Sequence, residues 1–153
     1  MNLFPIFRKN DFFSATEQQQ VIEAIRESEQ RTSGEIRIYV ESRCKYVDPL
    51  DRAAELFWSL KMDHTADRNA VLIYVATKDH QFAIYADEGI HQKVGQEFWN
   101  KEVLAMSGHF REHHHLEAII NVIADIGEAL FIHFPFIRET DKNELPDDII
   151  FGK

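Results

Sequence analysis

The sequence is poor in cysteine and contains no long apolar run. Cys44 is the only cysteine among 153 residues, so the chain cannot form an internal disulfide and does not require an oxidising compartment. No segment approaches the roughly 20 apolar residues that a membrane span needs. The first residues, MNLFPIFRKNDFF, place Pro5, Arg8 and Lys9 where a secretion signal would have a continuous apolar stretch. We therefore expect a mature cytoplasmic protein without a membrane span.

Basic charge is also scarce in this sequence. Lysine and arginine total 17 against 26 aspartates and glutamates, which gives a formal net charge of -9. This charge repels phosphate backbones and anionic lipid surfaces, and no local basic patch overrides it. The sequence therefore argues against nucleic acid as a partner.

The chain does contain enough apolar material for one core. Hydrophobic residues make up 44% of the sequence and aromatic residues 12%. A chain of this length can form one domain with a sizeable core, and there is no internal repeat, low-complexity tract or long linker. We expect a single monomeric domain over residues 1–153, with an acidic C-terminal tail over residues 136–153.

A capping pattern marks the start of the first predicted helix. In SATE, residues 14–17, Ser14 can accept a hydrogen bond from the amide of Glu17 while the Glu17 side chain reaches back. Val21, Ile22 and Ile25 then form its buried side. The helix should end before Gly34, which can take the left-handed conformation there.

Three further helices are predicted from caps and apolar spacing. Asp48-Pro49 is an N-cap followed by a proline at the first helical position, and the helical pattern continues to about Lys61. The chain again has a helical pattern after Gly89 to about residue 107. Apolar residues from Leu116 onward have the strongest helical periodicity in the chain, which ends at Phe134-Pro135.

Three segments are predicted to form strands of one small mixed sheet. In residues 35–41, EIRIYVE, apolar residues alternate with polar ones, whereas residues 70–76, AVLIYVA, form an unbroken apolar run. Such a run is typical of a central strand covered on both faces. Residues 78–80 are too short for a crossover, so residues 81–86 must return antiparallel as the second arm of a hairpin. The predicted fold class is α/β, with helices on both faces of the sheet.

Several segments together resemble the TPM domain family. They are S-x-x-E at 14–17, SGEIRIYVE at 33–41, NAVLIYVA at 69–76, FAIYADEGI at 82–90 and DKNELPDDI at 141–149. Their order and spacing extend the resemblance over nearly the whole chain. The family is named after a thylakoid-lumen protein, a photosystem II repair factor and a nematode receptor-associated protein, and it also occurs in many bacterial proteins. The chain resembles a stand-alone bacterial form.

The resemblance implies a fold and an activity. The family is similar to Rossmann-like three-layer α/β/α sandwiches, which agrees with the predicted helices and strands. Some plant members have been linked to acid phosphatase activity and to calcium, so the resemblance also implies a metal-dependent phosphatase. Many bacterial relatives carry a signal peptide and a membrane helix with a Gly-rich tail, and neither is expected in this chain.

The predicted topology gathers acidic residues at one edge of the sheet. If the first two strands are parallel and the third returns antiparallel, the starts of the first two lie beside the end of the third. Oxygen ligands converging there would suit Ca²⁺ or Mg²⁺. The alternative is that these side chains only cap strand ends and the next helix. The candidate ligands are Glu35, Asp67, Asn69, Asp87 and Glu88.

The opposite edge of the sheet offers a secondary site. Open α/β sheets usually bind ligands beyond the carboxyl ends of their parallel strands. Of the residues at that edge, Arg43 could hold a phosphate and His80 could act as an acid; the edge also offers Ser42, Thr77 and Asp79. The alternative is that residues 78–80 form an ordinary hairpin turn, for which aspartate is a favoured residue.

The acidic tail adds two secondary candidate ligands, Asp141 and Glu144. Asp141 and Asn143 have the Asp-x-Asn spacing that opens a calcium loop, but the glycine and the distant glutamate of an EF-hand are absent. The tail could fold back and donate one or two ligands to the sheet edge. Alternatively, Leu145-Pro146 and Ile149-Ile150 anchor it by packing and the acids stay solvated.

The run HFREHHHLE, residues 109–117, contains His-x-x-Glu-His, the order of one class of zinc peptidase. Such a site needs both histidines on one helical face, a third ligand and a protected pocket. Gly108 precedes the run and the strong periodicity begins only at Leu116, so we expect residues 108–115 to be a solvated junction between helices. The i, i+4 pair His113 and Glu117 could bind a transition metal adventitiously.

Two classes of function remain open from the sequence. Covalent phosphatase patterns are missing, because Leu50 stands where a Cys-x5-Arg loop starting at Cys44 needs arginine, and no Asp-x-Asp-x-Thr occurs. A cation-binding domain with weak phosphatase activity would therefore use a metal to activate water. The other class is a non-catalytic module that binds a protein partner through some of its aromatic residues, Phe57, Trp58, Phe98 and Trp99.

Overall fold

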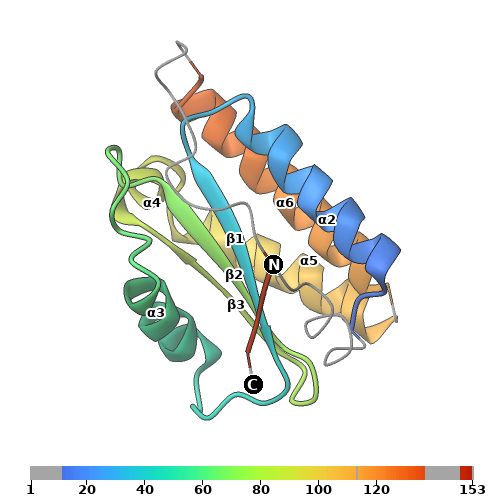
Figure 1. Cartoon of the computed structure of the whole chain (residues 1–153). Coiled ribbons are helices and arrows are strands. Elements are labelled where there is room, and N and C mark those ends of the chain that lie inside the picture. The colour runs from blue at the N-terminus through green and yellow to red at the C-terminus, as the bar shows by residue number, and fades with distance from the viewer. Residues whose placement is uncertain (1–11, 113, 137–148, 153) are drawn as a thin grey trace.

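Three strands form with the boundaries that the sequence predicts. They are β1 (Glu35–Glu41), β2 (Ala70–Ala76) and β3 (Gln81–Ala86). β1 and β2 are parallel, whereas β3 returns antiparallel to β2, as Figure 1 shows. The predicted reversal of the third strand is therefore confirmed.

A fourth strand, β4 (Ile149–Phe151), pairs in parallel with β1 and gives the sheet the order β3-β2-β1-β4. The computed structural model describes residues 12–112, 114–136 and 149–152. The expected tail thus ends in a strand, with Ile149 buried. Three residues are too few to show a strand pattern in an acidic segment. This strand is stabilised by pairing with β1, which the local sequence does not reveal. Asp141 and Glu144 lie outside the described residues.

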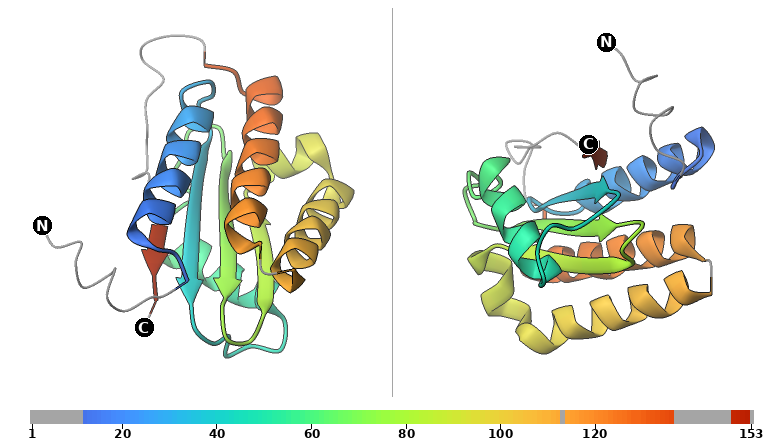
Figure 2. Two further views of the ribbon diagram at one scale, coloured as in Figure 1. Left: turned by 90° about the vertical axis from the view of Figure 1, so that its right-hand side faces the viewer. Right: turned by 90° about the horizontal axis from the view of Figure 1, so that it is seen from below.

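Helices cover both faces of the sheet and produce three layers. α2 (Ala15–Glu29), α5 (Gln96–Arg111) and α6 (His115–His133) lie on one face, and α3 (Pro49–Ser59) lies on the other (Figures 1 and 2). This arrangement confirms the predicted α/β/α sandwich. None of the described helices combines the length and the apolar character needed to cross a membrane.

The two faces of β2 belong to different hydrophobic clusters. Val71, Ile73 and Val75 pack with α2, α5 and α6. Leu72 and Tyr74 pack with α3, and every residue of β2 is buried. The alternation follows from the strand geometry, which points successive side chains to opposite faces. The unbroken apolar run is therefore explained by helices on both sides of this strand.

The predicted caps of α2 and α3 are confirmed. Ser14 and Glu17 form the capping box, and the Asp48 side chain accepts from the Leu50 amide at 2.9 Å. α2 ends before Gly34 as expected, at Glu29, but the left-handed conformation predicted for Gly34 is wrong, because Gly34 has no positive φ. Gly34 instead lies against α6, where an added Cβ would be 2.6 Å from Leu130 Cδ2.

The single helix predicted after Gly89 is two helices, α4 (Glu88–Val94) and α5. They are separated by Gly95, whose φ of +83° lies in the left-handed region. Good helical spacing on both sides hid this break. α5 also continues to Arg111, so the expected junction over residues 108–115 is shorter than predicted and His109 is helical.

We predict that Gly127→Ala destabilises the protein by about 1–3 kcal/mol, because a new methyl group would overpack the contact between α6 and α2. An added Cβ at Gly127 would lie 2.3 Å from Ser28 Oγ and 2.7 Å from Ser28 Cβ. Urea denaturation measures the change in the free energy of unfolding.

Gly108→Ala is the matched control, because its added Cβ would meet only Arg111 Nη2, at 3.9 Å. That variant should gain about 0.5–1 kcal/mol from the better helix propensity of alanine. Equal stabilisation by both substitutions would show that α2 and α6 are not in close contact at Gly127.

Candidate functional site

The topology brings the predicted edge residues to the same end of the sheet. Glu35 begins β1 and its amide donates to the Asn69 carbonyl oxygen at 3.4 Å. Asp87 follows β3, and its amide donates to the Ala70 carbonyl oxygen at 2.9 Å. Glu35, Asn69 and Asp87 are all nearly or fully buried, at 1%, 0% and 3% exposure. Residues distant in the sequence therefore meet at the starts of β1 and β2.

Asn69 is linked to Asp67 through Ser33. The Asn69 Nδ2 group donates to Ser33 Oγ at 3.1 Å, and Ser33 Oγ donates to Asp67 Oδ2 at 3.4 Å. In contrast, Asn69 Oδ1 is buried and has no hydrogen-bond partner among the described residues. The amide is thus held by its nitrogen while its oxygen, the atom that can bind a cation, is left unused.

Asp87 is held by an arginine that the sequence did not single out. Arg68 Nε and Nη2 donate to the two Asp87 carboxylate oxygens at 2.7 and 2.8 Å. Asp87 also accepts from the Glu88 amide at 2.8 Å and is the N-cap of α4. Arg68 Nη1 lies 3.8 Å from Glu88 Oε2. The proposed structural role of Asp87 as a helix cap is therefore present.

Gly89 allows the loop before β2 to cross directly over the start of α4. Its amide donates to the Arg68 carbonyl oxygen at 2.8 Å. An added Cβ would lie 2.1 Å from the Asp67 carbonyl oxygen and 2.5 Å from that of Arg68. Only glycine permits this approach, which holds residues 67 and 68 against α4.

The five predicted ligands divide into two parts. Asn69 and Asp67 are connected by Ser33, whereas Asp87 and Glu88 face Arg68. Within the described residues, three or more His, Cys, Asp or Glu ligand atoms come within 4.8 Å of one another only at His109, Glu112 and His114. The edge therefore gathers the predicted oxygen ligands without holding its carboxylates in one tight cluster.

The secondary site at the opposite edge is internally paired. Arg43 Nη1 donates to Asp79 Oδ1 at 2.9 Å, and the Cys44 amide donates to Asp79 Oδ2 at 2.7 Å. His80 lies in the hairpin turn with a φ of +53°. Asp79 thus ties the loop after β1 to the turn after β2, and residues 78–80 form the hairpin turn that the sequence analysis offered as the alternative.

A buried polar network near the same edge was missed by the sequence analysis. Arg52 binds both oxygens of the buried Glu41 carboxylate, from Nε at 2.9 Å and from Nη2 at 3.0 Å. The Tyr74 hydroxyl donates to Glu41 Oε2, and burial together with this hydrogen bond raises the pKa of Tyr74. The local sequence around Glu41 did not indicate this network, because the partners of Glu41 come from α3 and β2.

The four aromatic residues proposed to bind a protein partner differ in their exposure. Phe57 and Trp99 are buried, at 0% and 4% exposure, and belong to the core. Trp58 is 48% exposed, and the Arg68 guanidinium lies 5.9 Å from the centre of its ring. Phe98 is partly buried against the core. Half of the proposed aromatic set is therefore inaccessible to a partner.

A pair of carboxyl groups between α5 and α6 also escaped the sequence analysis. Glu102 is only 8% exposed and shares a hydrogen bond with Asp125. Burial and the Asp125 carboxyl raise the pKa of Glu102 to about 7. The pair lies beside a cavity of about 490 Å³ whose other charged or titratable lining residues are Lys93, Glu128 and His133.

Residues 6–129 of the chain match the model of a known family, the TPM domain. The chain belongs to the TPM domain family. The NMR structure of BA42 protein from the psychrophilic bacterium Bizionia argentinensis has 38% sequence identity and a TM-score of 0.84. The match covers 94% of this TPM domain chain and 97% of BA42.

Two further NMR structures share the fold of this TPM domain. The N-terminal domain of cg2496 protein from Corynebacterium glutamicum has 15% identity and a TM-score of 0.55, with coverage of 77% of this chain and 74% of that one. The N-terminal domain of a protein from P. gingivalis has 12% identity and a TM-score of 0.63, with 84% of each chain covered. Comparison with curated proteins gave no match.

We predict that the stability of this TPM domain falls as the pH rises from about 4.5 to about 7, because the folded state holds the Glu102 proton more tightly than the unfolded chain. Glu102→Gln removes this dependence and should be more stable than the natural chain by about 1–2 kcal/mol above that range. Urea denaturation across the pH range measures it.

Glu97→Gln is the control, since Glu97 is an exposed residue of the same helix. It should keep the pH dependence of the natural chain. A parallel loss of stability with pH in Glu102→Gln would mean that another group is responsible.

Proposed function

We propose that this TPM domain binds a divalent cation, Ca²⁺ or Mg²⁺, at the edge formed by the starts of β1 and β2. The observation that supports the proposal is the Asn69 side chain. It is fully buried and its Oδ1 accepts no hydrogen bond from the described residues, while Nδ2 is fixed on Ser33. A buried carbonyl oxygen without a partner costs about 1–3 kcal/mol, and a hard cation is a partner that would recover this energy.

The surroundings of Asn69 supply the remaining oxygen ligands. Asp67 is linked to Asn69 through the Ser33 hydroxyl, and Glu35 begins the neighbouring strand. Asp67 is exposed, so its carboxylate can move toward a cation with little change in the fold. Ca²⁺ accepts six to eight oxygens in flexible geometry, including amide, carboxylate and water oxygens. This mixed set suits Ca²⁺ better than a rigid octahedral Mg²⁺ site.

Arg68 competes with the cation for Asp87. Its guanidinium neutralises this buried carboxylate, yet 35% of the arginine side chain is exposed. A cation at Asn69 and Asp67 therefore does not have to displace Arg68, which is paired with Asp87 and Glu88. Recruitment of Asp87 as a further ligand requires Arg68 to leave it, which limits the affinity of the complete site.

Metal-dependent hydrolysis of phosphomonoesters is the activity that we place at this edge. A bound cation would polarise a phosphoryl oxygen and activate water. Arg68, once it is released from Asp87, has the planar donor pattern that binds phosphate oxygens. The partly exposed position of Arg68 beside the candidate ligands supports this second part of the proposal.

The cation site predicts that Asp67→Asn weakens Ca²⁺ binding by about tenfold or more, because one negatively charged ligand is lost. Titration of isotope-labelled protein with CaCl₂ should move the amide signals of Asn69, Asp87 and Gly89 first. Asp51→Asn, an exposed residue in the first turn of α3, removes the same charge far from the edge and should bind as the natural chain does. Equal affinities for the two variants would refute this placement.

Two further measurements separate the parts of the proposal. Arg68→Gln should tighten Ca²⁺ binding if Asp87 is a ligand, and unchanged affinity would exclude Asp87 from the site. Hydrolysis of p-nitrophenyl phosphate with Mg²⁺ or Ca²⁺ should fall in Asp67→Asn and persist in Asp51→Asn. Equal hydrolysis rates in both variants would assign the turnover to another site or to a contaminant and would leave cation binding to be judged by the titration.

A further inference from the structure

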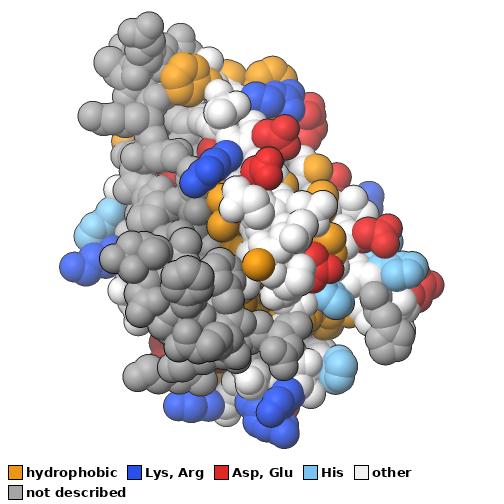
Figure 3. All heavy atoms as spheres, turned by 45° about the vertical axis from the view of Figure 1, so that its right-hand side comes forward, with side chains coloured by type: hydrophobic (Ala, Val, Ile, Leu, Met, Phe, Trp, Pro, Cys, Tyr) orange, Lys and Arg blue, Asp and Glu red, His pale blue; other side chains and the backbone are white. Residues whose placement is uncertain are grey.

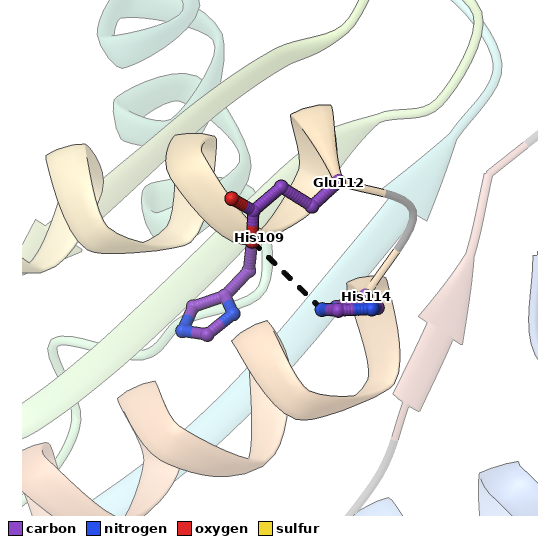
Figure 4. Close-up of side chains that lie close together, drawn as sticks. All are labelled: His109, Glu112 and His114. Atoms are coloured by element: carbon purple, nitrogen blue, oxygen red, sulfur yellow. Dashed lines mark ion pairs between the residues drawn. The ribbon is translucent and has the colours of Figure 1, made fainter.

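A second group of ligand-type side chains lies at the junction of α5 and α6. It consists of His109, Glu112 and His114, whose ligand atoms all lie within 4.8 Å of one another (Figure 4). Figure 2 shows this junction at the opposite end of the molecule from the starts of β1 and β2. The space-filling view of Figure 3 shows exposed histidine and acidic side chains close together on one part of the surface. The group is therefore independent of the proposed Ca²⁺ site.

At the end of α5, a turn closed on the His109 carbonyl oxygen brings these three residues together. The amides of Glu112 and His114 both donate to the His109 carbonyl oxygen, at 3.1 and 2.8 Å. These two bonds fold the chain back immediately after the helix, so side chains three and five positions apart point into one region. The C-terminal end of a helix also carries partial negative charge, which favours a bound cation.

The nitrogen atoms of this group have few competing partners. His109 Nδ1 is buried and makes no hydrogen bond with the described residues. His114 is the N-cap residue of α6, but its side chain makes no capping bond. His115 differs from both, because its ring packs on Phe12 at 4.6 Å between centres and near Phe110 at 6.2 Å. Of the histidines that the structure describes at this junction, His109 and His114 are the two whose ligand atoms lie within the group.

We propose that His109, Glu112 and His114 form a zinc site that fastens the end of α5 to the start of α6. Two imidazoles and one carboxylate are donor types that suit Zn²⁺, whereas Ca²⁺ and Mg²⁺ prefer oxygen ligands. Glu117 offers a fourth ligand, because its Oε1 lies 3.8 Å from His114 Nδ1. The same nitrogen lies 3.9 Å from Glu112 Oε1. The two carboxylates match the charge of the ion.

The carboxylates of Glu112 and Glu117 lie slightly farther from His114 Nδ1 than a bound ion would place them, at 3.9 and 3.8 Å. Two ligand atoms at tetrahedral angles on one Zn²⁺ lie about 3.3 Å apart, given bonds of about 2.05 Å. Glu112 and Glu117 therefore have to approach His114 Nδ1 by only about 0.5 Å. The side chains of Glu112 and His114 are 71% and 52% exposed, so small rotations are unopposed, but ordering them limits the affinity to the micromolar range.

This assignment differs from the zinc-peptidase pattern in the sequence. In His-x-x-Glu-His, Glu112 would be the catalytic base and the histidine that follows it would be a ligand. The fold instead places Glu112 among the ligands, with His114 beside it. The site thus holds two helices together, and its glutamate is not available to activate water.

Titration of the metal-free full-length chain with ZnCl₂ by calorimetry tests the site. The natural chain should bind one Zn²⁺ with micromolar affinity, and His114→Ala and Glu112→Gln should each weaken binding by about tenfold or more. His64→Ala is the matched control, since His64 is also an exposed histidine near an acid, with Nε2 3.8 Å from Asp63 Oδ1. It should bind as the natural chain does.

Thermal unfolding supplies a second readout. Zn²⁺ should raise the Tm of the natural chain because the ion binds the folded state, whereas His114→Ala should gain little. Tm values with EDTA establish that both variants fold. Unchanged zinc affinity in both His114→Ala and Glu112→Gln, or no binding by the natural chain, would overturn the proposal. Asp67→Asn should keep its zinc affinity, so failure of the Ca²⁺ site and failure of this site give different results.

Discussion

β2 is fixed between a parallel and an antiparallel neighbour, and the placement of the candidate Ca²⁺ or Mg²⁺ site depends on its register. All seven of its residues are buried, and they alternate between the layer of α3 and the layer of α2, α5 and α6. A slip of one residue would exchange the two sets of side chains. Tyr74 would then lose Glu41 and its hydroxyl would enter an apolar layer, so the register is strongly constrained. Because the register is fixed, Asn69 and Asp87 have to lie at the same end of the sheet.

Charge at that end is balanced within the fold. Asp87 is 3% exposed, and a carboxylate buried to this extent needs both hydrogen bonds and a positive partner. Arg68 and the first amide of α4 supply them, while Gly89 keeps the Arg68 backbone against the helix. The same residues therefore stabilise the start of α4 and control access to the Asp87 carboxylate. Cation binding at this edge would be coupled to the position of the loop before β2.

Local signals predicted much of the fold, and non-local contacts account for what was missed. The caps at Ser14 and Asp48 and the limits of β1, β2 and β3 depend on residues adjacent in the sequence, and they were predicted correctly. β4 is stable only because β1 lies beside it, so its acidic sequence context was misleading. Arg68 gave no signal because its partner lies 19 residues away, and the break at Gly95 was hidden by helical spacing on both sides.

The sequence by itself determined the order of β1, β2 and β3 along the chain, the reversal after β2 and the set of candidate ligands at one edge, because strand direction follows from the length of each connection. Only the tertiary structure decided which atoms meet. It left Asn69 Oδ1 without a hydrogen-bond partner among the described residues, paired Asp87 with Arg68, and brought Glu112 beside His114 where α5 turns into α6. The physical reason is that hydrogen bonds and ion pairs depend on side-chain positions to within about an ångström, and such positions are determined by the packing of elements that are distant in the sequence.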